Sequence, residues 1–246
     1  MPQIIHLSQT QSTNQYLRSF VESTKSREEG TVVWADFQTE GKGQPGNRWE
    51  SEKEKNLLFT LLLCPEGIEA VDQFIVSQVI SLAIVDVLST YSEGFSIKWP
   101  NDIYYKDKKI AGILIENDIS GKSIFASYIG IGININQESF VSDAPNPISL
   151  KQIIGEDICV EDMLNKILES IYYYYDIALE GNFELLRQDY MSSLYRNEGT
   201  FQFSDNNGVF NGRIKSIAEN GLITITDDKK KDRIYDFKEV SFVFES

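Results

Sequence analysis

Residues 95–116 read FSIKWPNDIYYKDKKIAGILIE. Three stretches of aromatic, β-branched and aliphatic residues in this segment, 95–99, 103–106 and 110–116, have the length and composition of strands. The polar KDKK of residues 106–109 is typical of a hairpin-like turn between the last two. The strands adjoin without room for a crossover helix, so a doubly wound parallel sheet is excluded and an α+β fold is predicted.

The flanking sequence supplies the other elements of this first unit. Further strands are expected at residues 31–37, 56–63 and 123–135, where apolar and β-branched residues run together. A helix is expected from about Ser12, a candidate N-cap, and a second over 68–91, which is apolar on most faces. A third is expected over 160–179, where apolar residues recur at three and four. These segments predict a mixed sheet flanked by helices.

The character of the chain changes after residue 199. Short β-like pieces follow one another every 8–12 residues or so, separated by turn residues such as Asn206-Asn207-Gly208 and Asn220-Gly221. This spacing is typical of a small antiparallel barrel or sandwich. We therefore predict two domains, residues 1–198 and 199–246, with a small SH3-like β-barrel as the second.

Composition excludes several classes of function. The 246 residues carry 37 Asp plus Glu against 23 Lys plus Arg, a formal charge of −14, which argues against a nucleic-acid partner. The single His6 cannot supply a multi-histidine zinc site. Cys64 and Cys159 form no CxxC pair and are expected to be buried thiols in a reducing compartment. With no signal peptide and no apolar stretch of about 18 residues, we expect a cytoplasmic protein without a membrane span.

The glycine-rich segment Gly41–Gly46, GKGQPG, matches the dinucleotide fingerprint GxGxxG letter for letter. A Rossmann turn must open directly into a helix, but residues 47–55 have no apolar helical face, and Pro45 removes a backbone donor. Two other interpretations remain open. The glycines, with Lys42 and Arg48, would suit a flexible loop that folds over an anion; alternatively the segment is a surface loop without a role.

Four stretches taken together indicate a family. Ser12-Thr13-Asn14 precedes the glycine loop, KWPND at 98–102 is followed by KIAGILIE at 109–116, and GIGIN occupies 130–134. In order and spacing they resemble the biotin protein ligases, or biotin–[acetyl-CoA-carboxylase] ligases, over nearly the whole chain including the C-terminal barrel. KWPND followed by KxAGxLxE is the specific part of this resemblance.

The resemblance implies a two-step reaction. ATP, as its Mg²⁺ complex, activates the biotin carboxylate to biotinyl-5′-AMP, and a lysine of a biotin carboxyl carrier protein domain then takes the biotin. A ligase for another carboxylate such as lipoate, and a non-catalytic adenylate-binding module, are the alternatives. The oligomeric state is left open between monomer and homodimer.

The resemblance also implies roles for particular residues. The catalytic residues are expected to be Lys109, Lys42 and Asp102, with Asp102 also serving Mg–ATP. Biotin is expected to contact the polar residues Ser12, Thr13, Asn14 and Gln38, the loop residues Gly41, Lys42, Gly43 and Gln44, then Lys109, Gly112, Gly130 and Gly132. The ATP or adenylate contacts are expected at Lys42, Arg48, Trp49, Asn101 and Asn134.

Each of these residues also has a simpler interpretation. Ser12 could serve only as a helix cap, Lys109 could be a solvated hairpin lysine, and Asn101-Asp102 a plain turn after Pro100.

The chain departs from the family pattern in its loop, which in the family is arginine-rich, near GRGRxxR. Lys42, Gln44 and Asn47 stand at the corresponding positions, and Arg48 is displaced by one. Lysine cannot form the bidentate phosphate contact of a guanidinium, and Gln44 carries no charge. We therefore expect weaker retention of the adenylate. Some family members also carry an N-terminal DNA-binding domain; only about ten residues precede Ser12, so a monofunctional ligase is expected.

Overall fold

The computed structural model describes residues 3–44, 46–141 and 146–244. Its larger unit is a seven-stranded sheet with the order β1-β2-β3-β7-β6-β5-β4. β1 and β2 are parallel, whereas all other neighbours in this sheet are antiparallel. The strands are β1 (Ile4–Leu7), β2 (Val32–Ala35), β3 (Leu57–Leu63), β4 (Phe95–Lys98), β5 (Asp102–Tyr105), β6 (Lys108–Ser120) and β7 (Ser123–Ile133).

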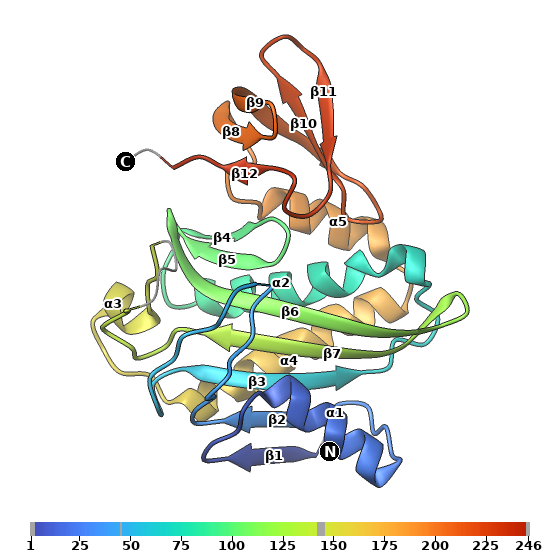
Figure 1. Ribbon diagram of the computed structural model, residues 1–246, viewed down its shortest axis with the longest axis vertical. Helices are drawn as coiled ribbons and strands as arrows, with labels where there is room; N and C mark the ends of the chain where they lie inside the picture. The colour runs from blue at the N-terminus through green and yellow to red at the C-terminus, as the bar shows by residue number, and fades with distance from the viewer. Residues whose placement is uncertain (1–2, 45, 142–145, 245–246) are drawn as a thin grey trace.

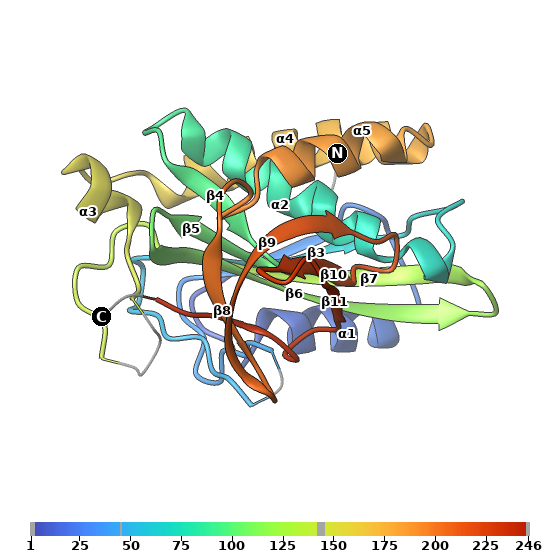
Figure 2. The ribbon, with the colours of Figure 1, turned by 90° about the horizontal axis from the view of Figure 1, so that it is seen from above.

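Helices cover the two faces of this sheet unequally. α2 (Phe74–Ser89), α4 (Val160–Leu179) and α5 (Phe183–Ser192) lie on one face, while α1 (Thr13–Thr24) lies on the other (Figures 1 and 2). The loop between β2 and β3 crosses the α1 side of the sheet in front of β7 and β6 (Figure 1). A short helix, α3 (Leu150–Ile154), follows β7 and is closed at its start by a capping box from Ser149 and Gln152. The face that carries the loop is therefore the one left open for a site.

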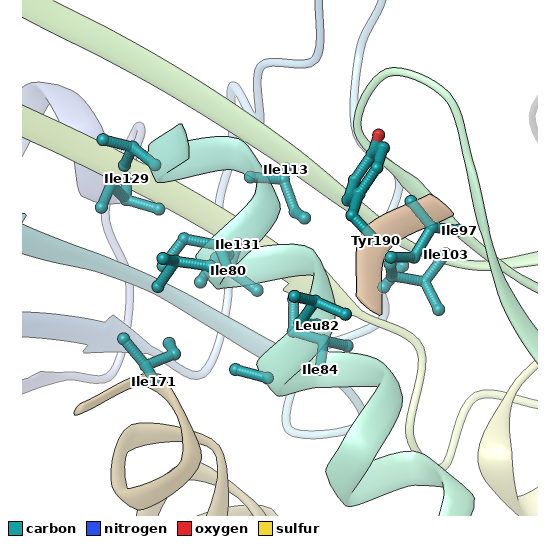
Figure 3. Packing of buried hydrophobic residues seen from close by; sticks show 14 of the residues in the cluster. Ile80, Leu82, Ile84, Ile97, Ile103, Ile113, Ile129, Ile131, Ile171 and Tyr190 are labelled. Carbon is teal, nitrogen blue, oxygen red and sulfur yellow. The ribbon is translucent and has the colours of Figure 1, made fainter. Parts of the chain in front are cut away.

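The main core lies between the sheet and α2 with α4. Ile80 and Ile84 of α2 and Ile129 and Ile131 of β7 are almost fully buried in it, together with Ile171 of α4 (Figure 3). The stretch Ala70–Ser89, which includes a 3₁₀ turn at Ala70–Asp72, is long and apolar enough to cross a membrane, and 72% of that window is buried inside the protein. This corrects the expectation that no apolar stretch reaches such a length, and the burial is that of a core helix.

The second unit is a five-stranded antiparallel sheet with the order β11-β10-β9-β8-β12, as expected for a small SH3-like barrel. Its strands are β8 (Phe201–Asp205), β9 (Gly208–Ile217), β10 (Ile223–Asp227), β11 (Asp232–Tyr235) and β12 (Ser241–Phe242). It contacts the first unit at Trp99, whose Nε1 donates to the Gly221 carbonyl at 2.9 Å and whose ring packs on Phe237 at 5.3 Å.

The predicted fold class, a mixed sheet flanked by helices with a C-terminal β module, is confirmed. Helix 160–179 has the predicted bounds, whereas α2 is shorter than predicted and α3 and α5 were not predicted. The β5–β6 turn is also tighter than expected, because β6 already begins at Lys108 and places Lys109 within a strand. Cys64 is half-buried and Cys159 is exposed, which corrects the expectation that both thiols are buried. The exact domain boundary, 198/199, stays a prediction.

Candidate active site

A cavity of about 130 Å³ lies between the β2–β3 loop and the open face of the sheet. Segments from widely separated parts of the sequence form its walls: the start of α1, the glycine loop, and strands β5, β6 and β7. Its lining includes Ser12, Thr13, Asn14, Gln38, Lys42, Gly43, Gln44, Arg48, Trp49, Asn101, Asp102, Lys109, Gly112, Gly130 and Gly132. The fold thus brings together most of the residues that the sequence motifs singled out.

The glycine loop is folded as a small hairpin. Its two arms pair where the Trp49 amide donates to the Gly41 carbonyl at 2.9 Å, and its tip is closed by the Gly43 amide donating to the Asn47 carbonyl at 3.1 Å. The chain then passes into β3, antiparallel to β2, with no helix in between. A Rossmann turn requires that helix, so the dinucleotide interpretation is wrong. Pro45 lies outside the described residues.

A β-bulge turns Lys109 toward the cavity. The register of β5 and β6 shifts between Ile103 and Tyr104, so that Ile103 faces Ala111 while Tyr104 faces Lys109. Ile110 is the extra residue, and its side chain is fully buried in the core. Without this shift strict alternation would put Lys109 on the opposite face from Gly112. The bulge therefore places the ammonium on the cavity side.

Lys109 is paired with Asp102 in the cavity wall. Its Nζ lies 2.6 Å from Asp102 Oδ1, and the two side chains are 24% and 21% exposed. The Trp49 ring is also near, with its centroid 5.7 Å from the same Nζ. Asn101 holds the neighbouring turn against β6, since its Nδ2 donates to the Ile113 carbonyl at 2.5 Å. The Lys109 ammonium thus lies near both Asp102 and Trp49 and still lines the cavity.

Three glycines form the floor, and the side chains above them explain why. A Cβ on Gly132 would lie 2.5 Å from Trp49 Cε2, and one on Gly112 would lie 2.9 Å from Trp49 Cζ3. A Cβ on Gly130 would lie 2.3 Å from Asn14 Oδ1. Because real Cβ contacts are not this short, only glycine lets the indole and the amide approach the sheet. The Trp49 indole and the Asn14 amide therefore pack directly on the backbone of these glycines.

One end of the cavity is polar and neutral. The Thr13 backbone amide and hydroxyl both contact Gln38 Oε1, at 2.8 and 3.0 Å. The Thr60 hydroxyl, from β3, contacts Asn14 Oδ1 at 2.6 Å and Thr13 Oγ1 at 2.8 Å. Ser12 has the extended backbone of an N-cap, yet its side chain makes no capping hydrogen bond. Its hydroxyl therefore remains available to the cavity, contrary to the purely structural interpretation.

The other end carries positive charge. Lys42 and Arg48 face each other across the hairpin as an isolated β-bridge and both line the cavity. Within the part of the chain that the structure describes, neither makes a salt bridge with an acidic side chain. Cations of this kind are well placed to receive an anionic ligand. Gln44 lies beside them and contributes no charge.

Some motif residues lie outside the lining. Gly41 is buried against the Trp49 backbone, where a Cβ would lie 2.7 Å from the Trp49 carbonyl oxygen. Asn134 is buried at the end of β7; its Nδ2 donates to Ile148 at 3.2 Å and its Oδ1 has no partner among the described residues. Lys98 of KWPND does not line the cavity: its ammonium lies 5.2 Å from the Tyr104 ring, and burial lowers its pKa.

Two residues beneath the polar end, Thr60 and Glu116, are not among the site residues predicted from the motifs. Thr60 is fully buried in a strand that is otherwise aliphatic and aromatic, LLFTLLL, and its being the lone polar residue there was the available signal. Glu116 closes the KIAGILIE motif, and its Oε2 accepts from Asn14 Nδ2 at 3.0 Å. Only the tertiary structure connects either residue to the cavity.

Known proteins share this combination of fold and cavity. The sequence model of the biotin/lipoate A/B protein ligase family matches residues 7–134. A bifunctional ligase/repressor BirA of Bacillus subtilis (strain 168) is 30% identical over 241 residues, which cover 93% of this chain and 70% of that protein. The structure of a biotin protein ligase from Aquifex aeolicus in complex with biotin and ATP matches all of this chain with a TM-score of 0.81 and 26% identity, and all of that chain is covered.

A biotin–[acetyl-CoA-carboxylase] ligase of Paracoccus denitrificans is 32% identical over 140 residues, 54% of this chain and 58% of that protein. The chain therefore belongs to the biotin/lipoate A/B protein ligase family. Its relatives include a biotin–[acetyl-CoA-carboxylase] ligase, and the structures that it matches include a biotin protein ligase, so the resemblance seen in the motifs is confirmed.

Proposed function

We propose that this chain is a biotin–carrier-protein ligase, which joins biotin to ATP as biotinyl-5′-AMP and then transfers it to a lysine of a biotin carboxyl carrier protein. The observation that carries this proposal is a single cavity with a neutral, hydrogen-bonding end and a cationic end. Lys109 lines the same cavity. The ureido ring of biotin would form hydrogen bonds at the neutral end, and the phosphates of ATP would bind at the cationic end. The biotin carboxylate would then lie beside Lys109.

The first step must bring two anions together. A carboxylate and an α-phosphate about 4 Å apart repel by roughly 4 kcal/mol even at an effective dielectric of 20. Lys109 would lie between them and neutralise the charge as the carboxylate oxygen attacks phosphorus and pyrophosphate leaves. Lys42 and Arg48 would hold the remaining phosphate charge from the loop. Asp102 keeps the Lys109 ammonium in position, at 2.6 Å, until the substrates arrive.

The second step needs a protected acyl-adenylate. The glycine hairpin crosses over the cavity and would keep water from the mixed anhydride. The acceptor lysine amine attacks the acyl carbon, the bond to the phosphate oxygen breaks, AMP leaves, and the amine loses its extra proton. Trp49 would stack on the purine, and its Nε1 is buried without a partner among the described residues, as is Asn134 Oδ1. Unpaired buried atoms of this kind suit a ligand that supplies the missing partners.

Magnesium fits the described residues poorly as a resident metal. No cluster of three or more metal-ligating His, Cys, Asp or Glu side chains occurs within the described ranges, and the one carboxylate of the cavity, Asp102, is already paired with Lys109. Mg²⁺ is commonly held through substrate phosphates with one or two carboxylates. We propose that it arrives with ATP, bound to the phosphates.

The proposed partner is the carrier domain of a biotin-dependent carboxylase, in line with the name of the Paracoccus relative. We further propose that the protein works in the cytoplasm without a nucleic-acid partner, which its charge of −14 supports. Monomer and homodimer remain alternatives that sedimentation would separate.

Biotin-dependent pyrophosphate release and transfer of labelled biotin to a carrier domain test the function directly. We expect both for the wild type, and a loss of at least about 100-fold in Lys109→Ala, because removing one such electrostatic contact costs that order. Lys108→Ala is the matched control, since Lys108 is exposed at the start of β6, and it should retain activity.

Two outcomes would contradict the proposal. Pyrophosphate release with lipoate but not biotin would favour the ligase for another carboxylate. Biotin and ATP binding without turnover would favour a non-catalytic module.

A further inference from the structure

A line of hydrogen bonds runs from the polar end of the cavity to the exposed side chain of Glu116, on the α1 side of β6. Thr13 contacts Thr60 at 2.8 Å, Thr60 contacts Asn14 Oδ1 at 2.6 Å, and Asn14 Nδ2 donates to Glu116 Oε2 at 3.0 Å. Thr13 and Asn14 line the cavity, whereas Thr60 and Glu116 lie outside its lining. The cavity is therefore connected to a carboxylate that no substrate would touch.

Glu116 pairs with Arg18 at the end of this line. Arg18 of α1 places its Nε 3.7 Å from Glu116 Oε2, and its Nη2 donates to the Glu116 carbonyl at 3.4 Å. The same guanidinium binds Asp118 at 3.0 Å and lies 4.0 Å from the Tyr128 ring. These contacts fix the carboxylate on the α1 side of β6.

A carboxylate can only accept hydrogen bonds, so the Asn14 amide must turn its nitrogen to Glu116 and its oxygen to Thr60. The Thr60 hydroxyl has one proton, and it must donate that proton to Asn14 Oδ1. The Thr13 hydroxyl then donates either to Thr60 or to Gln38 Oε1. In both arrangements the Thr13 proton stays inside the network, and Thr13 presents only an accepting lone pair to the cavity.

We infer that Glu116 is a positioning residue that sets the hydrogen-bond polarity of the biotin ring pocket through Asn14 and Thr60. This inference rests on the proposed function. A ureido group has two N–H donors and one carbonyl acceptor. With the polarity set in this way, Thr13 accepts from a ureido N–H. Gln38, whose Oε1 is occupied by Thr13, offers its Nε2 to the ureido carbonyl.

Without the negative charge of Glu116, the hydrogen bonds through Asn14 could run in either direction. With no anion to face, the Asn14 amide can reverse and donate to Thr60, which then donates to Thr13. The Thr13 proton is thereby free to point into the cavity, where it opposes the ureido N–H. The effect is specific to a ligand that donates to Thr13, and ATP does not contact this end.

Glu116→Gln tests the inference, because glutamine keeps the size of the side chain and can present either oxygen or nitrogen to Asn14. We expect the Kd for biotin, measured by titration calorimetry, to rise about tenfold, which corresponds to ~1.4 kcal/mol. The KM for ATP should stay within about twofold. Asp118→Asn is the matched control. Asp118 lies on β6 like Glu116 and also binds Arg18, but no described contact joins Asp118 to Asn14.

Variants at Thr60 provide the second, independent measurement. Thr60→Ser keeps the hydroxyl and should bind biotin as the wild type does, whereas Thr60→Val removes it and should weaken binding. In the Glu116→Gln/Thr60→Val double variant the two losses should be less than multiplicative, since both act through Asn14.

Two results would overturn the inference. One is unchanged biotin binding in Glu116→Gln; the other is an equal loss in Asp118→Asn or an equal rise in the KM for ATP. The wild type separates this failure from that of the proposed function, because a wild type that binds no biotin and releases no pyrophosphate refutes the function itself.

Discussion

Two loop residues, Lys42 and Arg48, hold the charge that faces the proposed phosphate site. Lys42 and Arg48 supply single positive charges from opposite arms of the hairpin, and Gln44 between them is neutral. Lysine is a point charge on a flexible stem and makes no bidentate contact with a phosphate. Retention of the adenylate is therefore expected to be weaker than in relatives whose loop is rich in arginine.

Gln44→Arg should slow the release of free biotinyl-AMP. A guanidinium at this position lines the same cavity and adds a charged contact to the phosphate, although partial exposure limits its contribution. We expect release about fivefold slower, equivalent to ~1 kcal/mol. The measurement is the appearance of free biotinyl-AMP after rapid mixing with biotin and ATP in the absence of carrier.

Val209→Arg adds the same charge on the exposed surface of β9 and serves as the control. Release at the wild-type rate in Gln44→Arg, or equal slowing in both variants, would refute a local effect of the loop charge.

Strand β7 shows how an element can serve the core and the site together. Its residues 129–133 read IGIGI, so the isoleucines point to the α2 side and the glycines to the cavity side. Isoleucine fills the core, whereas the missing Cβ atoms leave room for Asn14 above Gly130 and for Trp49 above Gly132. Two neighbouring glycines of β7 thereby support different contacts: Gly130 supports the proposed biotin contact through Asn14, and Gly132 supports the proposed ATP contact through Trp49.

Alanine at the two glycines should affect different substrates. Gly130→Ala displaces Asn14 and should raise the KM for biotin, whereas Gly132→Ala displaces the Trp49 indole and should raise the KM for ATP. Overpacking typically costs about 1–3 kcal/mol, so we expect an increase of about tenfold in each case. Initial-rate kinetics with each substrate varied in turn measure both constants.

The two variants are each other's control, because they differ only in position along one strand. If both raised the same KM, or if neither changed a KM, the division of the cavity into a ring end and a nucleotide end would be wrong.

At the scale of the whole molecule, aromatic residues join the sheet to the C-terminal unit. Tyr195, between α5 and β8, packs 5.4 Å from the Tyr104 ring and 5.9 Å from the Phe242 ring, and its hydroxyl donates to Asp107 at 2.5 Å. Burial, and then this hydrogen bond, raise the pKa of Tyr195 to about 12. The contact between the two units therefore includes a hydroxyl that must stay protonated.

This contact predicts a loss of stability at alkaline pH. In the unfolded chain the Tyr195 hydroxyl titrates near its ordinary pKa of 10.0, while in the folded chain it keeps its proton up to about 12. The folded state thus binds more protons in this window, so its stability is fully present below pH 10 and falls as pH rises toward 12. Urea unfolding at pH 9.0, 10.5 and 11.5 should show this fall, with a shallower slope in Tyr195→Phe.

The seven other tyrosines with raised pKa values remain in the variant and will keep most of the slope; they are Tyr104, Tyr128, Tyr172, Tyr174, Tyr175, Tyr190 and Tyr235. Equal slopes in the wild type and Tyr195→Phe would show that this hydroxyl does not carry the effect.

The local sequence by itself was enough to predict the fold class and the residue types of the site. Short strands at 95–116 without crossover helices, the helical period of 160–179 and the β-like pieces after 199 are local patterns, and local patterns follow from backbone geometry and alternate burial. The motifs likewise identified Lys109, Asp102 and the glycines of β7, because a recognisable spacing needs no knowledge of the fold.

Only the tertiary structure decided which of these groups face one another. The bulge at Ile110, which turns Lys109 into the cavity, depends on the register between two strands and leaves no mark in composition. The link from Glu116 to Thr13 joins residues 103 positions apart, and Thr60 enters it from a third element, β3. Which group donates a hydrogen bond and which accepts it depends on the neighbours that the fold brings together. The sequence therefore supplies these groups, but only the tertiary structure shows which of them pair.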